Sequence, residues 1–284
     1  MKNKLLLILI CFAAANLANA QTTVKKEYHI TGELLSTQEY KNGKKDGWYR
    51  IYNLEGTLTA TFIYKNGLKQ GESKSYYDNG TLSEAGQFLN DKQTGLWKKW
   101  NDEGVLIAED NYKNGKKVGI SKAYYKSGEI RSITEYKETN SRKETSTHKW
   151  FYKNGIIEGS QSFIESVRQD YKTYYETGVL SSSWVLKDNG RGPKENFYPS
   201  GKLSSTGNYK FSGSDKIDDW KYYYESGQLK AIGSYTYTSD KDGEWKHYYD
   251  NGKLEAIKVY KWGRKVGQWK YYDREGNLTK TLSY

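Results

Sequence analysis

The chain has three histidines, and their spacing decides whether they could bind a metal or transfer protons. His29, His148 and His247 stand far apart, and no two of them have the His-x-x-x-His spacing of a zinc site. The sequence also contains no Gly-x-Ser-x-Gly segment, phosphate-binding loop or dinucleotide fingerprint. We therefore predict that the protein has no catalytic residues, is not an enzyme and needs no cofactor.

Two acid-rich segments carry carboxylates at a spacing that could bind calcium. They are Asp215-Lys-Ile-Asp218-Asp219 and Asp240-Lys-Asp242-Gly243. Neither segment has the distant Glu that completes an EF-type loop. A glycosidase would need two carboxylates in one cleft, and the scattered acidic residues offer no such pair. We interpret both segments as lengthened hairpin turns and predict no metal site.

Aromatic side chains are the strongest candidates for binding, because the chain has 28 Tyr and 9 Trp but only 7 Phe. Evenly spaced rings on an exposed sheet can stack on sugar rings or anchor a protein partner. The same rings could instead pack on one another and hold the sheet together. The candidate binding residues are Trp97, Trp100, Trp220, Tyr223, Trp245, Tyr248, Trp269 and Tyr272.

These rings belong to a repeat of about 24 residues that fills the chain after residue 27. In ten copies, an aromatic residue stands four positions before a glycine, and Leu or Ile stands two positions after it. We call this glycine the turn glycine. The turn glycines are Gly56, Gly80, Gly104, Gly128, Gly155, Gly178, Gly201, Gly227, Gly252 and Gly276.

A second turn, Tyr-Lys-Asn-Gly, separates the copies at residues 40–43, 64–67 and 112–115. Asn-Gly between alternating aromatic and polar residues predicts a hairpin with a type I′ turn, in which both central residues have positive φ. Asn79-Gly80 and Asn251-Gly252 predict the same turn type around the turn glycine. Each repeat should therefore contain two short strands and two tight turns.

We predict an all-β fold: an elongated tandem-repeat array of antiparallel β-hairpins that forms a twisted, open meander sheet of about ten repeats. A lone repeat buries too little surface to fold, so neighbouring repeats should stabilise each other. Residues 21–46 should form an N-terminal cap with a degenerate first half-repeat, and residues 47–284 the ten repeats. Residues 139–219 are less regular, because they lack the Tyr-Lys-Asn-Gly motif at the position of the second turn and contain both prolines.

The faces on which the rings lie are left open by the sequence. Trp245 and Tyr248 are three residues apart, and an ideal strand would place them on opposite faces. Either both faces of the sheet carry aromatic residues, or a β-bulge reorients one of the two rings.

The N-terminus has the features of a secretory signal peptide. Lys2 and Lys4 precede an apolar stretch at residues 5–15, and Ala18-Asn19-Ala20 forms a small-x-small site that predicts cleavage between Ala20 and Gln21. The apolar stretch is too short to cross a membrane, and no other segment approaches the ~20 residues needed. We expect an exported protein that is periplasmic, on the cell surface or secreted, with no transmembrane segment.

The single cysteine and the net charge bear on possible anchors and partners. Ile10 stands before Cys11, where a lipoprotein signal would have a small residue, so we expect Cys11 to leave with the signal peptide. The net charge of +11 could attract an acidic partner, such as an anionic polymer or a membrane surface. Because lysines occur in every repeat, we favour a role in solubility and in protection of the sheet edges.

The repeat resembles a known family. The frame Gly-x-Trp-x-x-Tyr-Tyr-x-x-Gly-x-Leu is clearest at residues 243–254 and 267–278, and Tyr-Lys-Asn-Gly-Lys-x-x-Gly stands between earlier copies. Over residues 28–284 this pattern resembles the MORN repeat variant family. The resemblance implies stacked β-hairpins and a role in protein or membrane interaction. Bacterial members are often labelled YwqK-like antitoxins, which implies a toxin as a partner.

The leading hypothesis is an exported, non-catalytic repeat protein that serves as a protein-interaction or scaffolding surface at the cell envelope, with an unknown protein partner. One alternative is a glycan-binding protein that uses its Trp and Tyr rings to bind an envelope polysaccharide. A second alternative is an antitoxin-like or immunity-like partner of a toxin. Export argues against nucleic acid as a ligand.

Overall fold

The computed structural model describes residues 21–137, 145–187, 190–210 and 215–284. In these residues it forms a single 24-stranded β-sheet, which confirms the predicted all-β array. No helix in the described ranges is long and apolar enough to span a membrane. The predicted signal peptide, Cys11 and the Ala20 side of the cleavage site lie outside the described residues. The predicted boundary between residues 46 and 47 falls inside a strand, and the division into cap and repeats stays a prediction.

The strands are short and similar in length. They are β1 (Thr22–Tyr28), β2 (Leu34–Lys41), β3 (Lys44–Tyr52), β4 (Leu58–Lys65), β5 (Leu68–Tyr76), β6 (Leu82–Leu89), β7 (Lys92–Trp100), β8 (Leu106–Lys113), β9 (Lys116–Lys117), β10 (Gly119–Tyr124), β11 (Ile130–Lys137), β12 (Thr145–Phe151), β13 (Ile157–Ile164), β14 (Val167–Tyr174), β15 (Leu180–Val185), β16 (Arg191–Phe197), β17 (Leu203–Lys210), β18 (Lys216–Tyr223), β19 (Leu229–Tyr235), β20 (Lys241–Tyr248), β21 (Leu254–Lys261), β22 (Arg264–Lys265), β23 (Gln268–Tyr272) and β24 (Leu278–Ser283).

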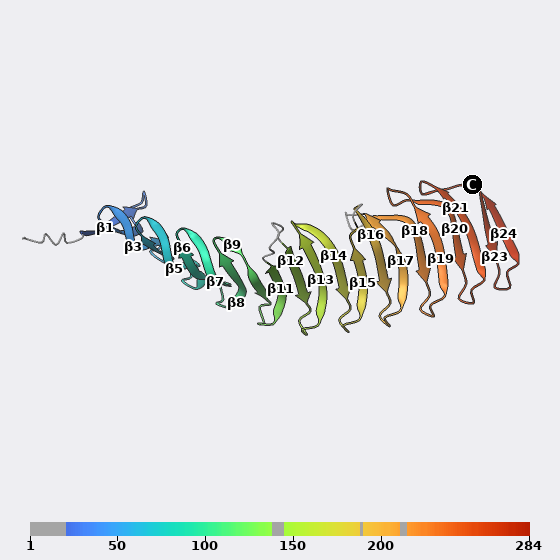
Figure 1. The fold of residues 1–284 in the computed structure, drawn as a ribbon, viewed down its shortest axis with the longest axis horizontal. Helices are drawn as coiled ribbons and strands as arrows, with labels where there is room; N and C mark the ends of the chain where they lie inside the picture. The colour runs from blue at the N-terminus through green and yellow to red at the C-terminus, as the bar shows by residue number, and fades with distance from the viewer. Residues whose placement is uncertain (1–20, 138–144, 188–189, 211–214) are drawn as a thin grey trace, which may run out of the picture.

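The strands form a meander in which neighbours in the chain pair antiparallel, from β1–β2 to β23–β24. Figure 1 shows the strands side by side in chain order along the long axis of the molecule, with the C-terminus at one end and a twist along the row. Two strands are interrupted. The two-residue strands β9 and β22 continue after a short break as β10 and β23, and both parts pair with the same preceding strand.

The turn that holds the turn glycine differs from the predicted type I′ turn. In the ninth repeat, Tyr249 N donates to Lys253 O (2.8 Å) and Gly252 N donates to Tyr249 O (2.9 Å). Gly252 has a φ of 83°, whereas Asn251 is not among the residues with positive φ. The loop is therefore a three-residue turn with one left-handed residue. The prediction was wrong because the extra loop residue leaves the left-handed conformation to the glycine alone.

The same two hydrogen bonds close all ten of these turns. They also close an eleventh turn in the N-terminal half-repeat, where His29 N donates to Glu33 O (2.8 Å) and Gly32 N donates to His29 O (3.0 Å). Tyr28 pairs with Leu34 there, as the aromatic residue and the leucine do in the full repeats. The degenerate first half-repeat thus has the hairpin geometry of the others.

The second turn is a two-residue type I′ turn, as predicted. Asn66 and Gly67 both have positive φ, at 50° and 92°, and Lys65 pairs with Leu68 across them. The same geometry occurs at Glu165-Ser166, with φ of 50° and 65°. A part of the irregular middle therefore keeps this turn without the Asn-Gly sequence. The other turns of this kind are Asn42-Gly43, Asn90-Asp91, Asn114-Gly115 and Trp262-Gly263.

A β-bulge lies next to the aromatic residue that stands four positions before each turn glycine, and its place decides on which faces the rings lie. His247 pairs with Ala256 and Tyr248 pairs with Leu254, so the extra residue, Glu255, lies on the following strand. Alternation is therefore unbroken from Trp245 to Tyr248, and their side chains lie on opposite faces. The register shifts at this position in every repeat, so both faces carry aromatic residues.

Candidate functional site

Four of the candidate binding residues occupy one position of the repeat, seven residues before the turn glycine. They are buried in the sheet face that we call the aromatic face, with exposed fractions of 3% for Trp97, 0% for Trp220, 2% for Trp245 and 5% for Trp269. Other rings of this face surround them. Tyr235, for example, meets Trp245 edge to face, with ring centroids 5.1 Å apart.

Glycine and a backbone carbonyl hold three of these indoles in place. A Cβ atom on Gly233 would lie 2.2 Å from the ring of Trp245, so only glycine leaves room for the indole. The indole N–H of Trp245 donates to Ser234 O at 3.1 Å. Gly86 and Gly207 make the same room for Trp97 and Trp220. The indole N–H of each donates to the carbonyl of the residue that follows its glycine, Gln87 or Asn208.

The fourth indole keeps the hydrogen bond but has no glycine beneath it. Trp269 donates to Val259 O at 2.9 Å, and the Lys258 ammonium lies 5.7 Å from its ring centroid. All four indoles are therefore packing residues in this structure. Binding through them stays a prediction, and stacking of a sugar would require the ring to leave its packed position.

The other four candidates occupy the frame position four residues before the turn glycine. Trp100, Tyr223, Tyr248 and Tyr272 are half-buried and lie on the face opposite the buried indoles. The structure thus separates the eight candidate residues into two sets on two faces, and of the eight it brings only Tyr223 and Trp245 to one pocket.

A second set of tyrosines, absent from the predicted site, links successive repeats. Tyr224, three residues before its turn glycine, donates its hydroxyl to the backbone oxygen of Tyr248 in the next repeat, at 2.8 Å. Seven tyrosines make this bond, at 2.7 to 2.9 Å, and we call them the tyrosine ladder. They are Tyr77, Tyr125, Tyr152, Tyr175, Tyr198, Tyr224 and Tyr249.

The ladder is interrupted where asparagine replaces tyrosine. The Asn53 side-chain oxygen accepts from Thr57 N (2.8 Å), and the Asn101 side-chain oxygen accepts from Val105 N (2.8 Å). These two side chains bond within their own turns, and Asn53 reaches the next repeat only through its Nδ2 atom, which donates to the Asp78 carboxylate at 3.3 Å, not to a backbone oxygen as a tyrosine hydroxyl does. Asp273 also bonds within its own turn in the last repeat.

Lysines at another fixed position, eleven residues before the turn glycine, lie over the buried rings. The Lys216 ammonium is 4.7 Å from the Trp220 ring centroid, and that of Lys241 is 4.4 Å from the Trp245 ring centroid. Lys265 lies 4.9 Å from the ring centroids of Trp269 and Tyr284. We call Lys216, Lys241 and Lys265 the lysine row.

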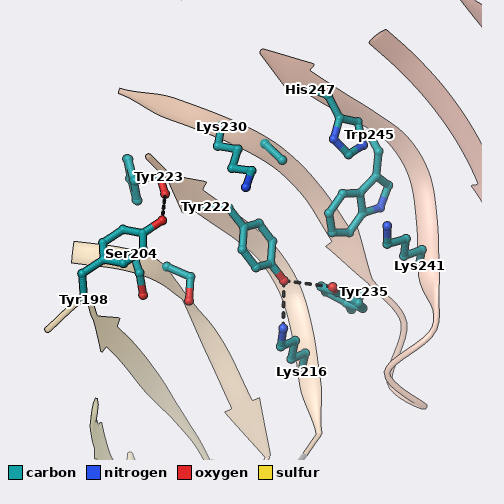
Figure 2. A pocket seen from close by; sticks show the side chains of 12 residues that line it. Tyr198, Ser204, Lys216, Tyr222, Tyr223, Lys230, Tyr235, Lys241, Trp245 and His247 are labelled. Carbon is teal, nitrogen blue, oxygen red and sulfur yellow. Dashed lines mark hydrogen bonds between the residues drawn. The ribbon is translucent and has the colours of Figure 1, made fainter. Parts of the chain in front are cut away.

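The aromatic face is hollowed between β17 and β20 into a pocket with a volume of about 520 Å³. Figure 2 shows Lys216, Tyr222 and Tyr235 joined by hydrogen bonds, with Trp245 and His247 beside them on the neighbouring strand. The Lys216 ammonium donates to the Tyr222 hydroxyl at 2.9 Å, and the hydroxyls of Tyr222 and Tyr235 lie 2.9 Å apart. The other lining residues are Tyr198, Ser204, Ser205, Tyr223, Lys230, Ala231 and Lys241.

None of the twelve residues that line the pocket is acidic. Among the described residues, no carboxylate forms an ion pair with a lysine of the row or with Lys230. Burial lowers the pKa of Lys216, and the positive charges of Lys194 and Lys241 lower it further. Burial, together with Lys258, also lowers the pKa of Lys241.

His247 lies beside these lysines and is partly buried. Burial and the charges of Lys258, Lys241 and Lys230 lower its pKa to about 4, so its imidazole is neutral at pH 7. Its Nε2 atom is buried without a hydrogen-bond partner. Burial, and to a lesser extent the bond to Tyr235, raises the pKa of Tyr222. The pocket therefore offers ammonium groups and hydroxyls, which suit the binding of an anion.

The acid-rich segments do not gather ligands for a metal. No group of three or more His, Cys, Asp or Glu side chains that could hold an ion occurs in the part of the chain that the structure describes. Asp240 accepts from the Thr238 hydroxyl (2.8 Å), and Asp242 accepts from Trp262 N (3.1 Å) in the next turn. Asp219 accepts from the Ser234 hydroxyl. These carboxylates bond to turns and to a neighbouring strand.

Sequence comparison identifies the repeat in much of the chain. The model of a family described as MORN repeat variant matches seven segments that together make up about half of the chain: 69–90, 93–114, 117–138, 192–211, 219–237, 241–261 and 265–284. The hairpins at Gly56, Gly155 and Gly178 lie outside these segments but close with the same hydrogen bonds. No curated protein matches the chain.

Two solved structures were found to be similar to this one. The crystal structure of TcdB2-TccC3 has 10% identity and a TM-score of 0.18, and the comparison covers 92% of this chain and 19% of that one. The crystal structure of TcdB2-TccC3 without its hypervariable C-terminal region has 12% identity and a TM-score of 0.18, with 91% and 14% covered. The chain thus spans less than a fifth of the length of either.

Proposed function

The chain belongs to the MORN repeat variant family, and on this premise we propose that it is an exported, non-catalytic repeat protein that serves as a protein-interaction scaffold at the cell envelope. The family and the repeated β structure fit a non-catalytic repeat protein. The envelope location and a protein partner are the parts that we add.

One observation carries the proposal: the described residues form a single sheet of 24 strands in which the same turn hydrogen bonds recur from repeat to repeat. A solenoid-like array of this kind presents an extended surface whose length is set by the number of repeats. Such a surface can contact a partner at several points at once, which suits a scaffold. The half-buried rings on the face opposite the indoles, such as Tyr223 and Tyr248, supply anchors of the type enriched at protein interfaces.

The predicted signal peptide supports export. Cleavage between Ala20 and Gln21 would leave the whole of β1 intact, because β1 begins at Thr22. Every described strand therefore lies within the mature chain, residues 21–284. Export is also compatible with a mature chain without cysteine, since the only cysteine is Cys11.

Two measurements test the proposal. In cells that express the full chain, we expect the mature protein to begin at Gln21 and to fractionate outside the cytoplasm; an uncleaved cytoplasmic protein would contradict export. For the partner, a photo-cross-linking residue is placed at Tyr248 or, on the other face, at Tyr235. A scaffold should cross-link one defined protein from one face, and unlabelled mature chain should compete for it. Cross-links that excess unlabelled chain does not reduce would contradict a specific interaction surface.

A further inference from the structure

The lysine row has a regular spacing that a ligand could match. Lys216, Lys241 and Lys265 occupy the same position in three successive repeats, on β18, β20 and β22. Each is two strands from the next, which corresponds to about 10 Å at the usual strand separation. The ammonium groups lie over the rings of the aromatic face, so they are held in line along the sheet.

Within the described residues, no carboxylate forms an ion pair with the row. Some lysines of this chain pair with a carboxylate, as Lys117 does with Asp110 at 2.8 Å and Lys246 with Glu244 at 3.3 Å. The lysine row has no such pair within the described residues, and Lys194 and Lys258 add positive charge on the same face. Like charges that are close together and partly desolvated raise the free energy of the unliganded protein. An anionic ligand would remove this cost.

The spacing discriminates among polyanions. An extended acidic peptide presents side chains to one face about every 7 Å, and DNA carries one phosphate per about 3.4 Å of each strand. Both are more densely charged than the row. A polysaccharide with one acidic group per disaccharide places its charges about two pyranose rings apart, which is comparable to the distance across two β-strands. The pocket beside Lys216 also supplies the Tyr222 and Tyr235 hydroxyls and the unpartnered His247 Nε2 for sugar hydroxyls.

We propose that a linear acidic polysaccharide with one carboxylate per disaccharide binds along the aromatic face of the last three repeats, with successive carboxylates beside Lys216, Lys241 and Lys265. The sugar between two carboxylates lies over Tyr222 and Tyr235, which line the pocket. This site uses lysines and half-buried tyrosines, and the buried indoles serve as its floor. The inference goes beyond the protein scaffold proposed above and does not depend on it.

Binding to defined polymers tests the inference on the mature chain, residues 21–284. The probes are fluorescent hyaluronate oligosaccharides, poly-L-glutamate, a thymidine oligonucleotide and neutral dextran. Hyaluronate has one carboxylate per disaccharide, and the three charged probes carry equal numbers of charges. We expect hyaluronate to bind at least about tenfold more tightly than either other polyanion, with an affinity that falls as salt is added, and dextran not to bind. Tighter binding of the peptide or the oligonucleotide, or no binding of hyaluronate, would overturn the proposal.

Two matched triple variants separate the row from net charge. K216Q/K241Q/K265Q removes three charges from the aromatic face, and K221Q/K246Q/K270Q removes three from the opposite face of the same repeats. We expect the first to weaken hyaluronate binding on the order of 30-fold or more, since three charged contacts are lost, and the second to change it less than about threefold. Equal effects would show nonspecific attraction and contradict the site. Near-ultraviolet circular dichroism of both variants confirms that the aromatic face is still packed.

Discussion

The N-terminal repeats (residues 21–137) and the C-terminal repeats (residues 190–284) share one backbone but bury different side chains. Apart from Trp97, the buried hydrophobic residues among those described lie at or beyond Trp184. They are Trp184, Tyr209, Ile217, Trp220, Ala231, Trp245, Ala256 and Trp269. Apart from Ser205, the buried polar residues all precede residue 122: Ser36, Gln38, Thr61, Ser73, Asp110 and Ser121.

The difference shows that the turns and bulges define the backbone, whereas the residue type at the buried position varies from repeat to repeat. Seven residues before the turn glycine, the second and fourth repeats have Ser73 and Ser121, and the last three repeats have tryptophan. The hydrogen bonds of the turns are the same in both regions. The C-terminal repeats therefore gain more from burial of apolar surface, at about 25 cal/mol per Å².

The fourth repeat differs from the C-terminal repeats in the pairing of one lysine, and the two regions differ in their links between repeats. Lys117 forms an ion pair with buried Asp110, whereas Lys241, at the equivalent position, has none among the described residues. The tyrosine ladder is broken at Asn53 and Asn101 but is continuous from Tyr125 to Tyr249. We expect the C-terminal repeats to be the more stable region and the one that binds an anion.

Of the changes that test this comparison, removal of a buried indole should have the largest effect on stability. Trp220→Ala empties a fully buried position and should lower the free energy of unfolding by about 3–5 kcal/mol. Trp262→Ala is the matched control, because Trp262 is 61% exposed and should change stability by less than about 0.5 kcal/mol. Chemical denaturation followed by tryptophan fluorescence and circular dichroism measures both. Similar losses in the two variants would mean that the aromatic face is not the core.

Equivalent lysines in the two regions should respond in opposite directions. Lys117→Gln leaves the buried Asp110 carboxylate without its ion pair and should destabilise the protein by about 1–2 kcal/mol. Lys241→Gln removes a charge that faces Lys216 and Lys258, so it should leave stability unchanged or raise it slightly. Melting temperatures of the two variants and of the wild type at low and high salt test this prediction. A loss of stability in Lys241→Gln as large as that in Lys117→Gln would refute the difference in charge.

Loss of one rung of the tyrosine ladder should have a smaller effect. Tyr224→Phe removes the hydroxyl that bonds to Tyr248 O and should cost about 1 kcal/mol. Tyr237→Phe is the control, because Tyr237 is 64% exposed and lies outside the ladder. Denaturant titration compares the two. If Tyr224→Phe matches the wild type as closely as the control does, the ladder does not link the repeats.

The smallest effect concerns pH. Folding lowers the pKa of His247 from 6.5 to about 4, so the unfolded chain takes up the proton first as the pH falls. The contribution of neutral His247 is therefore fully present above about pH 6.5 and is lost as the pH falls toward about 4. The groups facing His247 are Lys230, Lys241 and Lys258, with Trp245 beside it.

His247→Gln should accordingly reduce the fall in melting temperature between pH 7 and pH 5. The effect is modest because the imidazole is only partly removed from water. Thermal unfolding at the two pH values measures it, with Lys221→Gln as a charge-changing variant on the opposite face. An identical fall in the wild type and in His247→Gln would contradict the assignment.

Much of the fold could be predicted from the sequence, because the turn glycines and their flanking aromatic and aliphatic residues recur in register. Asn66-Gly67 was correctly expected to form a type I′ turn, but Asn251-Gly252 was not distinguishable from it. The same dipeptide forms either turn, and the number of residues between the paired strand ends decides which. That number is set by the pairing of Tyr248 with Leu254, which the dipeptide itself does not indicate.

Less of the site could be predicted. The tryptophans were predicted as binding residues from the sequence. Their burial depends on Gly207 and Gly233 in neighbouring strands and on indole hydrogen bonds to the backbone oxygens that follow these glycines. The lysine row was hidden, because lysines occur in every repeat and their importance lies in the absence of a nearby carboxylate. For the tyrosine ladder a signal was present: tyrosine recurs three residues before the turn glycine.

Native-state hydrogen exchange tests most directly the claim that one backbone frame carries two different interiors. The comparison is between amide protons of β18 to β21 and those of β3 to β6. The two groups lie the same number of strands from the nearest edge of the sheet. We predict at least about tenfold slower exchange in β18 to β21, because indole packing and the continuous ladder raise the cost of local opening. Equal protection in the two regions, or slower exchange in β3 to β6, would contradict the account.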